Sequence, residues 1–376
     1  MPDLSITPAA SFGPPVRAGN RVYLLTGQWR ANWGGGSRRA SNSTSDLLVD
    51  FWSFDATTLQ PLYRKRIQKV PDGAMYGRAI MGIQNQTAWL LLPSGLHATN
   101  LQTGALRATP KDIEDKNPQL RGLLPTEGRY YTFTKQAGMT VVAADASTWY
   151  VHPDTLQAAK QPHQIENIPP PHFTPMATHA FQERGYVLGT HWLGMLTADE
   201  ATKFDRPRGI AGLDHQTPRA LYSADVTKAE TFFGAEDRVG NLKTLTQPFL
   251  ASGLLSLPLG SGPNALVYRR DPDSVFILHK SRIDEEAVIQ LARVTGPEGK
   301  VIWNVALPLS VLQSVLPGEE SLVFYGRLFT KADPNDRVRR DPMHTAREML
   351  ISIDWKTGNH KQHDQSDTKR HPDATN

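Results

Sequence analysis

A strand–turn–strand pattern recurs along this chain of 376 residues and limits the folds that it can adopt. Each copy has an alternating apolar strand, a tight turn with Asp, Asn, Thr or Gly, and a second short strand. Asp and Asn bond their own backbone in such turns, Gly supplies a positive φ, and β-branched and aromatic residues favour the strands. The copies lie roughly 45 to 60 residues apart, or about twice that, which is typical of a repeat fold. The clearest copies are residues 50–67, 96–108, 148–161, 291–307 and 349–362.

Residues 78–108 form one unit that can be followed strand by strand. Four short strands alternate with turns, and four such antiparallel strands make one blade of a β-propeller. The sequence therefore predicts an all-β fold, a single propeller of seven blades, with six or eight as alternatives. The strands are predicted at residues 78–83, 87–92, 96–100 and 105–108, and the blades at residues 12–68, 78–108, 120–161, 175–206, 217–245 (the least distinct), 248–305 and 310–362.

Two segments carry the repeat motif most completely, IDWKTGNHK at 353–361 and VTGPEGKVIW at 294–303. They resemble the xDxxTGxxxW turn that often ends a blade in PQQ-like β-propeller repeats. The resemblance covers most of residues 20–362, and the whole chain also resembles an uncharacterised family of single-domain bacterial propeller proteins. Proteins with this repeat usually carry an export signal or a membrane anchor, so the resemblance implies a periplasmic or secreted protein.

The two ends of the chain carry further expectations. A propeller ring is commonly closed by strands from both chain ends, so we expect residues 12–18 or 21–28 to pair in the blade that ends at 349–362. The propeller domain is expected to span residues 1–362. The polar, aperiodic residues 363–376 are predicted to be a disordered tail.

A quinone cofactor is the first enzymatic function that the repeat suggests. That resemblance would imply a calcium-bound quinone, often above a pair of adjacent cysteines, but the chain has no cysteine. A G-x-S-x-G elbow, an H-E-x-x-H motif and a complete Walker loop are also missing from the sequence. No cofactor and no catalytic residue are therefore predicted, and enzymatic activity stays uncertain.

The composition and the N-terminal residues indicate which class of partner the protein binds and where in the cell it is located. Charges of both signs are interleaved and sum to +4, whereas a nucleic-acid binder usually has a denser basic patch. No apolar run is long enough for a transmembrane helix, and the first 16 residues lack the basic and apolar regions of a signal peptide. We expect a monomer without a nucleic-acid partner, from which a native export signal or anchor has been removed.

Histidines and carboxylates supply the other candidate chemistry. Six of the twelve histidines lie between residues 152 and 215, and imidazoles can bind zinc or copper. Their spacing is irregular, so singly bonded or solvent-exposed histidines are favoured and no metal site is predicted. The acidic clusters at 112–115, 199–200 and 284–286 are interpreted as solvated turn residues. The histidines are His152, His163, His172, His179, His191 and His215.

Residues 307–318 are the one segment for which the spacing of apolar residues predicts helix. Leu309, Leu312 and Leu316 fall three or four positions apart, and Pro317-Gly318 ends the pattern. We expect one or two helical turns between two blades.

Two long loops, residues 29–46 and 330–346, are the predicted binding site. Each interrupts a hairpin of a terminal blade, and long loops in compact domains are often functional or disordered. Trp and Arg are preferred anchors of protein interfaces, although the Trp side chains could instead fold back onto the blade. If the first and last blades are neighbours, the loops lie side by side and form a basic rim for an acidic partner. The predicted partner-binding residues are Trp29, Arg30, Trp33, Arg38, Arg39, Arg337, Arg339, Arg340 and His344.

The sequence thus favours a non-enzymatic binding or scaffold protein of the bacterial cell envelope that recognises a protein through one propeller face. The alternative is an enzyme, a hydrolase or lyase that acts on a carbohydrate or another small molecule in the central channel.

Overall fold

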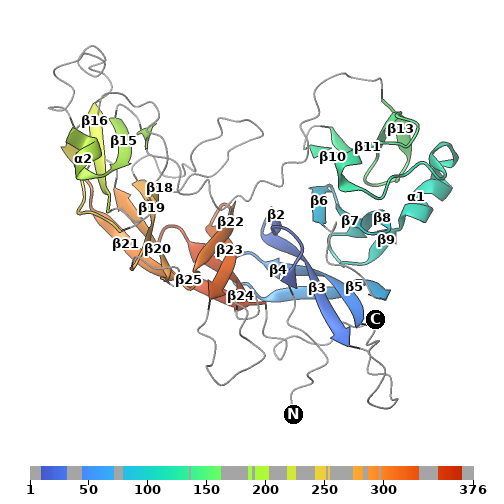
Figure 1. Cartoon of the computed structure of the whole chain (residues 1–376), viewed down its shortest axis with the longest axis horizontal. Helices are drawn as coiled ribbons and strands as arrows, with labels where there is room; N and C mark the ends of the chain where they lie inside the picture. The colour runs from blue at the N-terminus through green and yellow to red at the C-terminus, as the bar shows by residue number, and fades with distance from the viewer. Residues whose placement is uncertain are drawn as a thin grey trace, which may run out of the picture. The chain divides into compact units, whose positions relative to one another are not determined.

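The computed structural model divides the chain into two compact units, residues 1–174 together with 363–376, and residues 175–362. Both units are built from β-strands (Figure 1). Among the residues that the structure describes, no helix is long and apolar enough to cross a membrane. These residues are 10–31, 45–71, 79–134, 137–161, 185–188, 191–202, 218–225, 242–250, 253–254, 274–282, 287–295, 298–329 and 346–365.

The first unit contains three antiparallel sheets in chain order (Figure 1). A connection between the second and third sheets contains one short α-helix and two 3₁₀ turns. The first sheet comprises β1 (Ala10–Ser11), β2 (Val16–Ala18), β3 (Arg21–Ala31), β4 (Ser45–Asp55) and β5 (Pro61–Pro71); the second β6 (Ala79–Gln84), β7 (Thr87–Leu92), β8 (Gly95–Asn100) and β9 (Leu106–Ala108); the connection α1 (Pro110–Lys116), η1 (Pro118–Leu120) and η2 (Gly128–Tyr130); and the third sheet β10 (Tyr131–Thr134), β11 (Gly138–Val142), β12 (Thr148–Val151) and β13 (Ala158–Lys160).

The second unit is built on the same plan, with four antiparallel strands in chain order in each sheet. The fourth sheet comprises β14 (Gly185–Leu188), β15 (His191–Leu196), β16 (Ala220–Asp225) and β17 (Lys243–Thr244), with helix α2 (Ala198–Thr202) after β15; the fifth β18 (Gly253–Leu254), β19 (Ser274–Lys280), β20 (Ile289–Thr295) and β21 (Val301–Leu307); and the sixth β22 (Val311–Pro317), β23 (Ser321–Phe329), β24 (Ala346–Asp354) and β25 (His360–Asp364).

Sequential four-stranded antiparallel sheets are the blades of a β-propeller, so the predicted fold class is confirmed. The described part of the chain contains six antiparallel sheets, of which the first has five strands and the other five have four each. Residues 175–206 and 217–245, predicted as separate blades, were wrongly divided, because β14 to β17 from both segments pair in one sheet. A blade number of seven therefore stays unsupported by the described strands.

The predicted pairing of the two chain ends in one blade is wrong for the strands described. β1 and β2 both pair with β3, and β3 pairs with β4, so residues 12–18 and 21–28 complete the first sheet. The sixth sheet has four strands of its own. β25 extends through His363 and Asp364, two residues into the predicted tail, and residues 366–376 lie outside the described residues.

Strand β7 shows how neighbouring sheets of the first unit pack. All six of its residues are buried, although successive side chains of a strand point to opposite faces. Leu90 and Leu92 join the core cluster shared with the first sheet, whereas Trp89 and Leu91 join the cluster shared with the third sheet. Strand β7 is therefore apolar throughout because both of its faces are covered.

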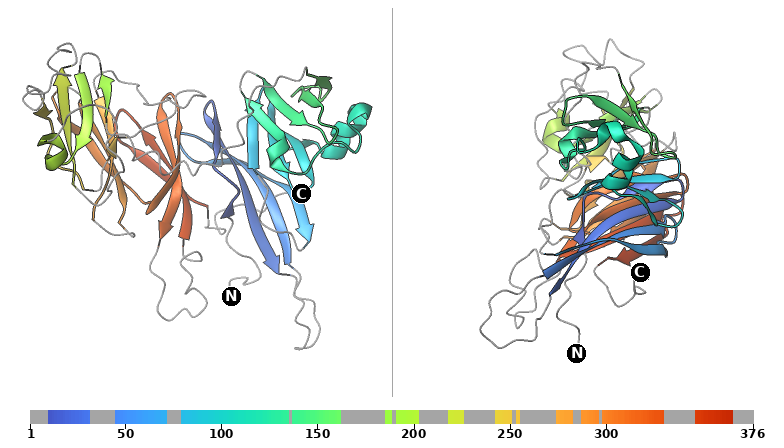
Figure 2. Two further views of the ribbon diagram at one scale, coloured as in Figure 1. Left: turned by 45° about the horizontal axis from the view of Figure 1, so that its top comes forward. Right: turned by 90° about the vertical axis from the view of Figure 1, so that its right-hand side faces the viewer.

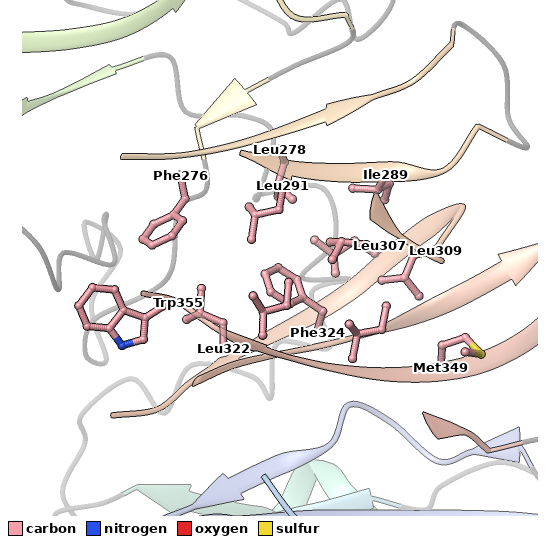
Figure 3. Close-up of a cluster of buried hydrophobic side chains, with 13 residues drawn as sticks. Phe276, Leu278, Ile289, Leu291, Leu307, Leu309, Leu322, Phe324, Met349 and Trp355 are labelled. Atoms are coloured by element: carbon pink, nitrogen blue, oxygen red, sulfur yellow. The ribbon is translucent and has the colours of Figure 1, made fainter. Parts of the chain in front are cut away.

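The fifth and sixth sheets enclose a corresponding core in the second unit (Figure 3). Phe276, Leu291 and Leu307 project from the fifth sheet toward Leu322 and Phe324 of the sixth. Leu309 and Leu312 belong to the same cluster, but residues 311–317 form strand β22, so the predicted helix at 307–318 is wrong. Pairing of β22 with β23 across a bulge outweighs the helical spacing of the leucines.

The predicted turn between the third and fourth strands of a blade is confirmed as one repeated six-residue turn. In each copy the first N–H donates to the sixth carbonyl, and the fifth N–H donates to the first carbonyl, at 2.8–3.0 Å. The fifth residue has a positive φ of 57–78°, which explains Gly104, Gly299 and Gly358. The described copies are residues 55–60, 100–105, 152–157, 295–300 and 354–359.

The first side chain of this turn accepts hydrogen bonds from the turn backbone. Oδ1 of Asp55, Asn100 and Asp354 accepts from the N–H groups two and three residues later, at 2.8–3.0 Å. In the third sheet Nδ1 of His152 takes the same place, at 3.2 and 3.4 Å. The requirement is thus for an acceptor atom at this position.

Helix α1 corrects the interpretation of the acidic cluster 112–115 as turn residues. Thr109 and Asp112 form a capping box, in which the Asp112 carboxylate accepts from Thr109 N at 2.8 Å. These bonds lower the pKa of Asp112. Asp199 and Glu200 likewise lie in helix α2 and not in a turn, and residues 284–286 lie outside the described residues.

Candidate functional site

The structure places two of the predicted partner-binding residues, both at the end of β3. Trp29 is partly buried and packs against the core between the first and second sheets. Arg30 lies opposite Asp46 of β4 in the strand pairing. Outside the described residues lie Trp33, Arg38, Arg39, Arg337, Arg339, Arg340 and His344.

The hairpin that carries the loop 29–46 is an extended stem. Strands β3 and β4 are eleven residues each and pair continuously from Arg21–Asp55 to Ala31–Ser45. Strand β5 is equally long and pairs with β4 up to Pro71. Figure 2 shows β3, β4 and β5 as the long dark-blue and light-blue strands of the first sheet.

An ion-pair network braces this stem on the face of β4 away from the apolar core. Asp50 is 1% exposed and binds Arg64 Nη2 at 2.6 Å and Arg66 Nε at 2.5 Å, both from β5. Arg64 also lies 4.8 Å above the ring of Trp52. Because the carboxylate is removed from water and held by two guanidinium groups, the network fixes β5 against β4.

We name the strands β3, β4 and β5 the first braced stem. Two more side-chain interactions lie along it. The Trp52 indole N–H donates to Thr26 Oγ1 at 2.9 Å across β3 and β4. Lys69 Nζ lies 2.8 Å from Asp46 Oδ2, next to the root of the loop. The stem is thus cross-linked by side chains over most of its length.

The hairpin that carries the loop 330–346 has a similar construction, and we name it the second braced stem (β23 and β24). Its nine-residue strands pair from Ser321–Asp354 to Phe329–Ala346. Glu348 is 6% exposed, accepts from the Tyr325 hydroxyl at 2.8 Å and lies 3.7 Å from Arg327. A buried carboxylate on the third strand, bound by an arginine of a neighbouring strand, is common to both stems.

Both long loops connect the second and third strands in the pairing order of their sheets. The strand order is β1-β3-β4-β5 in the first sheet and β22-β23-β24-β25 in the sixth. The stems belong to different units, and the adjacency of the two loops stays a prediction.

Of the six clustered histidines, two are described. His152 is the acceptor of the third-sheet turn, and His191 begins β15 opposite Asp225. His163, His172, His179 and His215 lie outside the described residues. Within the described ranges, no three His, Asp or Glu side chains are grouped as metal ligands would be.

A serine and a histidine in the β7–β8 hairpin form a polar group that the sequence analysis missed. Ser94 is exposed in the turn, and its Oγ lies 3.3 Å from Nε2 of the buried His97. His97 Nδ1 lies 3.0 Å from the Gly95 carbonyl, and Gln68 Nε2 lies 3.3 Å from Ser94 Oγ. Burial lowers the pKa of His97, which keeps its ring neutral.

Comparison with known proteins adds little to these observations. The sequence matches no family model and no curated protein. The chain is similar to the β-propeller domain of the trilobed protease from Pyrococcus furiosus, with 8% identity, a TM-score of 0.25 and 96% of each chain covered. It is also similar to Pyrococcus horikoshii acylaminoacyl peptidase, with 9% identity, a TM-score of 0.23, and 96% of this chain but 52% of the peptidase covered.

A third similar structure is regucalcin from Agrobacterium tumefaciens, described as a calcium-binding protein, with 12% identity, a TM-score of 0.20, and 81% and 85% of the two chains covered. The chain thus spans about half the length of the peptidase and most of the other two proteins. At these identities and TM-scores the similarities say nothing about activity, and the fold rests on the sheets described above.

Proposed function

We propose that this chain is a protein-binding scaffold of the bacterial cell envelope, periplasmic or secreted, of the PQQ-like propeller type. It acts as a monomer and binds a protein partner through one face, with the loops 29–46 and 330–346 as the contact. The observation that carries the proposal is that both loops stand on long stems with a buried, arginine-bound carboxylate.

The braced stems support this function because they fix where each loop begins. An ordinary turn between two strands of a blade does not require strands of eleven residues. A loop that binds a partner loses less conformational entropy on binding if the residues at its two ends are already ordered. Between the two strands, the first loop sequence carries Trp33, Arg38 and Arg39, and arginines favour an acidic partner surface, whereas Trp29 lies in β3 and packs against the core.

The test compares binding by variants that keep the stems. Residues 32–44 or 330–345 are replaced by an Asn-Gly turn, and a matched control has residues 226–241 of the fourth sheet shortened in the same way. The partner is captured from envelope extract, identified, purified and titrated against each variant. We expect at least a tenfold weaker affinity for each loop variant and an unchanged affinity for the control.

A second test of the proposal reverses the charge of two arginines in the loop 29–46. The double substitution R38E/R39E should weaken binding to an acidic partner, and the loss should be largest at low ionic strength. Equal binding by the intact chain and both loop variants would contradict the proposal.

The alternative is a hydrolase or lyase acting on a small molecule, expected in the central channel. The observation that favours a hydrolase is the pairing of Ser94 with His97, at the β7–β8 turn.

A further inference from the structure

Four groups that meet at the β7–β8 turn have the chemistry of an acyl-transfer centre. They are the Ser94 hydroxyl, the His97 imidazole, the Gly95 carbonyl and the Gln68 amide, and all lie in the first unit. A nucleophile bonded to a base, with the base oriented by a third group, is the arrangement that nucleophilic catalysis requires.

The tautomer of His97 follows from its partners. A carbonyl oxygen only accepts hydrogen bonds, so Nδ1, 3.0 Å from Gly95 O, carries the proton. In the neutral ring Nε2 is then an acceptor, and the Ser94 hydroxyl donates to it over 3.3 Å. His97 is therefore placed to take the proton of Ser94 Oγ when that oxygen attacks an electrophile.

Gly95 holds the orienting carbonyl by a backbone conformation that other residues rarely adopt. Its φ is +112°, and a Cβ at this position would lie 3.1 Å from the Pro110 side chain. The carbonyl that fixes the His97 tautomer is thus part of the turn and cannot rotate away without changing the hairpin.

Gln68 supplies a donor from the neighbouring sheet. Its Nε2 donates to Ser94 Oγ over 3.3 Å from strand β5. Because this bond occupies a lone pair of Oγ, it leaves the hydroxyl proton to point at His97 Nε2.

We propose that Ser94 is a nucleophile that hydrolyses short-chain carboxylic esters, with His97 as general base and Gln68 as a residue that positions the Ser94 hydroxyl. Ser94 Oγ bonds to the ester carbonyl carbon while its proton passes to His97 Nε2. The carbon–alkoxide bond then breaks, and His97 returns the proton to the leaving alcohol. Water attacks the acyl-Ser94 ester in the same way, which releases the acid and restores the serine. The exposed position of Ser94 favours small, activated esters.

The experiment uses the full chain with p-nitrophenyl acetate, and a fluorophosphonate probe followed by peptide mapping. We expect p-nitrophenol release above the buffer rate and a probe adduct on Ser94. Ser94→Ala should abolish both. His97→Gln should lower the rate by about 10²–10⁴-fold, and Gln68→Ala, which removes only a bond that positions Ser94, by about 10-fold. The rate should rise with pH through an inflection below 6.5, as His97 loses its proton.

Ser147→Ala is the matched control, because Ser147 is a partly exposed turn serine that bonds Asp145 and Trp149 and, unlike Ser94, bonds no histidine among the described residues. It should keep the rate and the adduct. If His97→Gln fails to fold, Ser94→Ala and Gln68→Ala still decide the test. An adduct on another residue, or an unchanged rate in Ser94→Ala, overturns the proposal. Neither outcome depends on binding by the loops 29–46 and 330–346.

Discussion

The phenol of Tyr63 donates a hydrogen bond of 2.8 Å to the backbone carbonyl of Leu101, which links the outer strand of the first sheet to the turn of the second. Trp303 makes the equivalent bond in the second unit, from β21 to the Lys356 carbonyl at 3.2 Å. Each aromatic residue is the ninth counted from the start of its own turn. The aromatic position of the repeat motif thus joins one blade to the turn of the next.

We predict that Tyr63→Phe destabilises the protein by about 1 kcal/mol, because it removes one neutral hydrogen bond and keeps the ring packing. Trp303→Phe should cost more, since the smaller ring also loses contact with the turn. Thermal or urea unfolding measures both changes. A Tyr63→Phe protein as stable as the parent would show that the bond makes no net contribution.

The buried network of the first braced stem yields a larger effect. Asp50→Asn should destabilise the protein by about 3 kcal/mol, because Arg64 and Arg66 then lose the charge that compensates them. The control is Glu127→Gln. Glu127 pairs with Arg129 at 2.7 Å, but both side chains are more than half exposed, so the cost should be about 0.5 kcal/mol or less. Equal effects of the two substitutions in urea unfolding would argue against the brace.

Substitution of the turn glycines separates backbone strain from contact. Gly358 has φ +78°, and a Cβ there would meet the Trp303 ring at 2.9 Å, whereas Gly122 has φ +71° and no atom within 4 Å. Gly122→Ala should cost about 1 kcal/mol from the backbone alone. Gly358→Ala should cost clearly more, and the difference between their unfolding free energies measures the Trp303 contact.

Acid should destabilise the second unit through His279, which bonds Asn304 Oδ1 at 3.1 Å. Burial lowers the pKa of His279 below its usual value of 6.5. Above that pH the folded and unfolded chains are both neutral at this group, and the stability is fully present. As the pH falls below 6.5, the unfolded chain binds a proton first, so stability is lost until the folded pKa is passed.

We therefore expect the urea midpoint to fall between pH 7 and pH 5, with a smaller fall in His279→Gln, whose side chain does not titrate. An identical pH dependence in the variant would assign the acid sensitivity to other groups.

Local chemistry explains what could be predicted from the sequence. Strands β6 to β9 lie within two residues of their predicted bounds, because Asn85, Gly95 and Gly104 mark their turns. Helix α1 was missed although Thr109, Pro110 and Asp112 are an ordinary helix start. Here the capping signal was outweighed by the expectation of strands.

Non-local pairing explains what could not be predicted. Strands β15 and β16 join one sheet across a long connection, which the local patterns of residues 175–206 and 217–245 do not reveal. The loops 29–46 and 330–346 could be recognised because each separates two predicted strands by more residues than a hairpin turn needs. The arginines that bind Asp50 could not be predicted from the sequence, because a bulge in β5 sets which residues lie opposite Asp50.

The acceptor position of the repeated turn has a consequence for how such turns can be found in a sequence. Asp, Asn, His and Thr all occupy it, and each accepts from the turn backbone. What the five described copies share is the pair of backbone bonds and the positive φ of the fifth residue. A search for Asp or Asn alone would therefore pass over the copies that begin at His152 and Thr295.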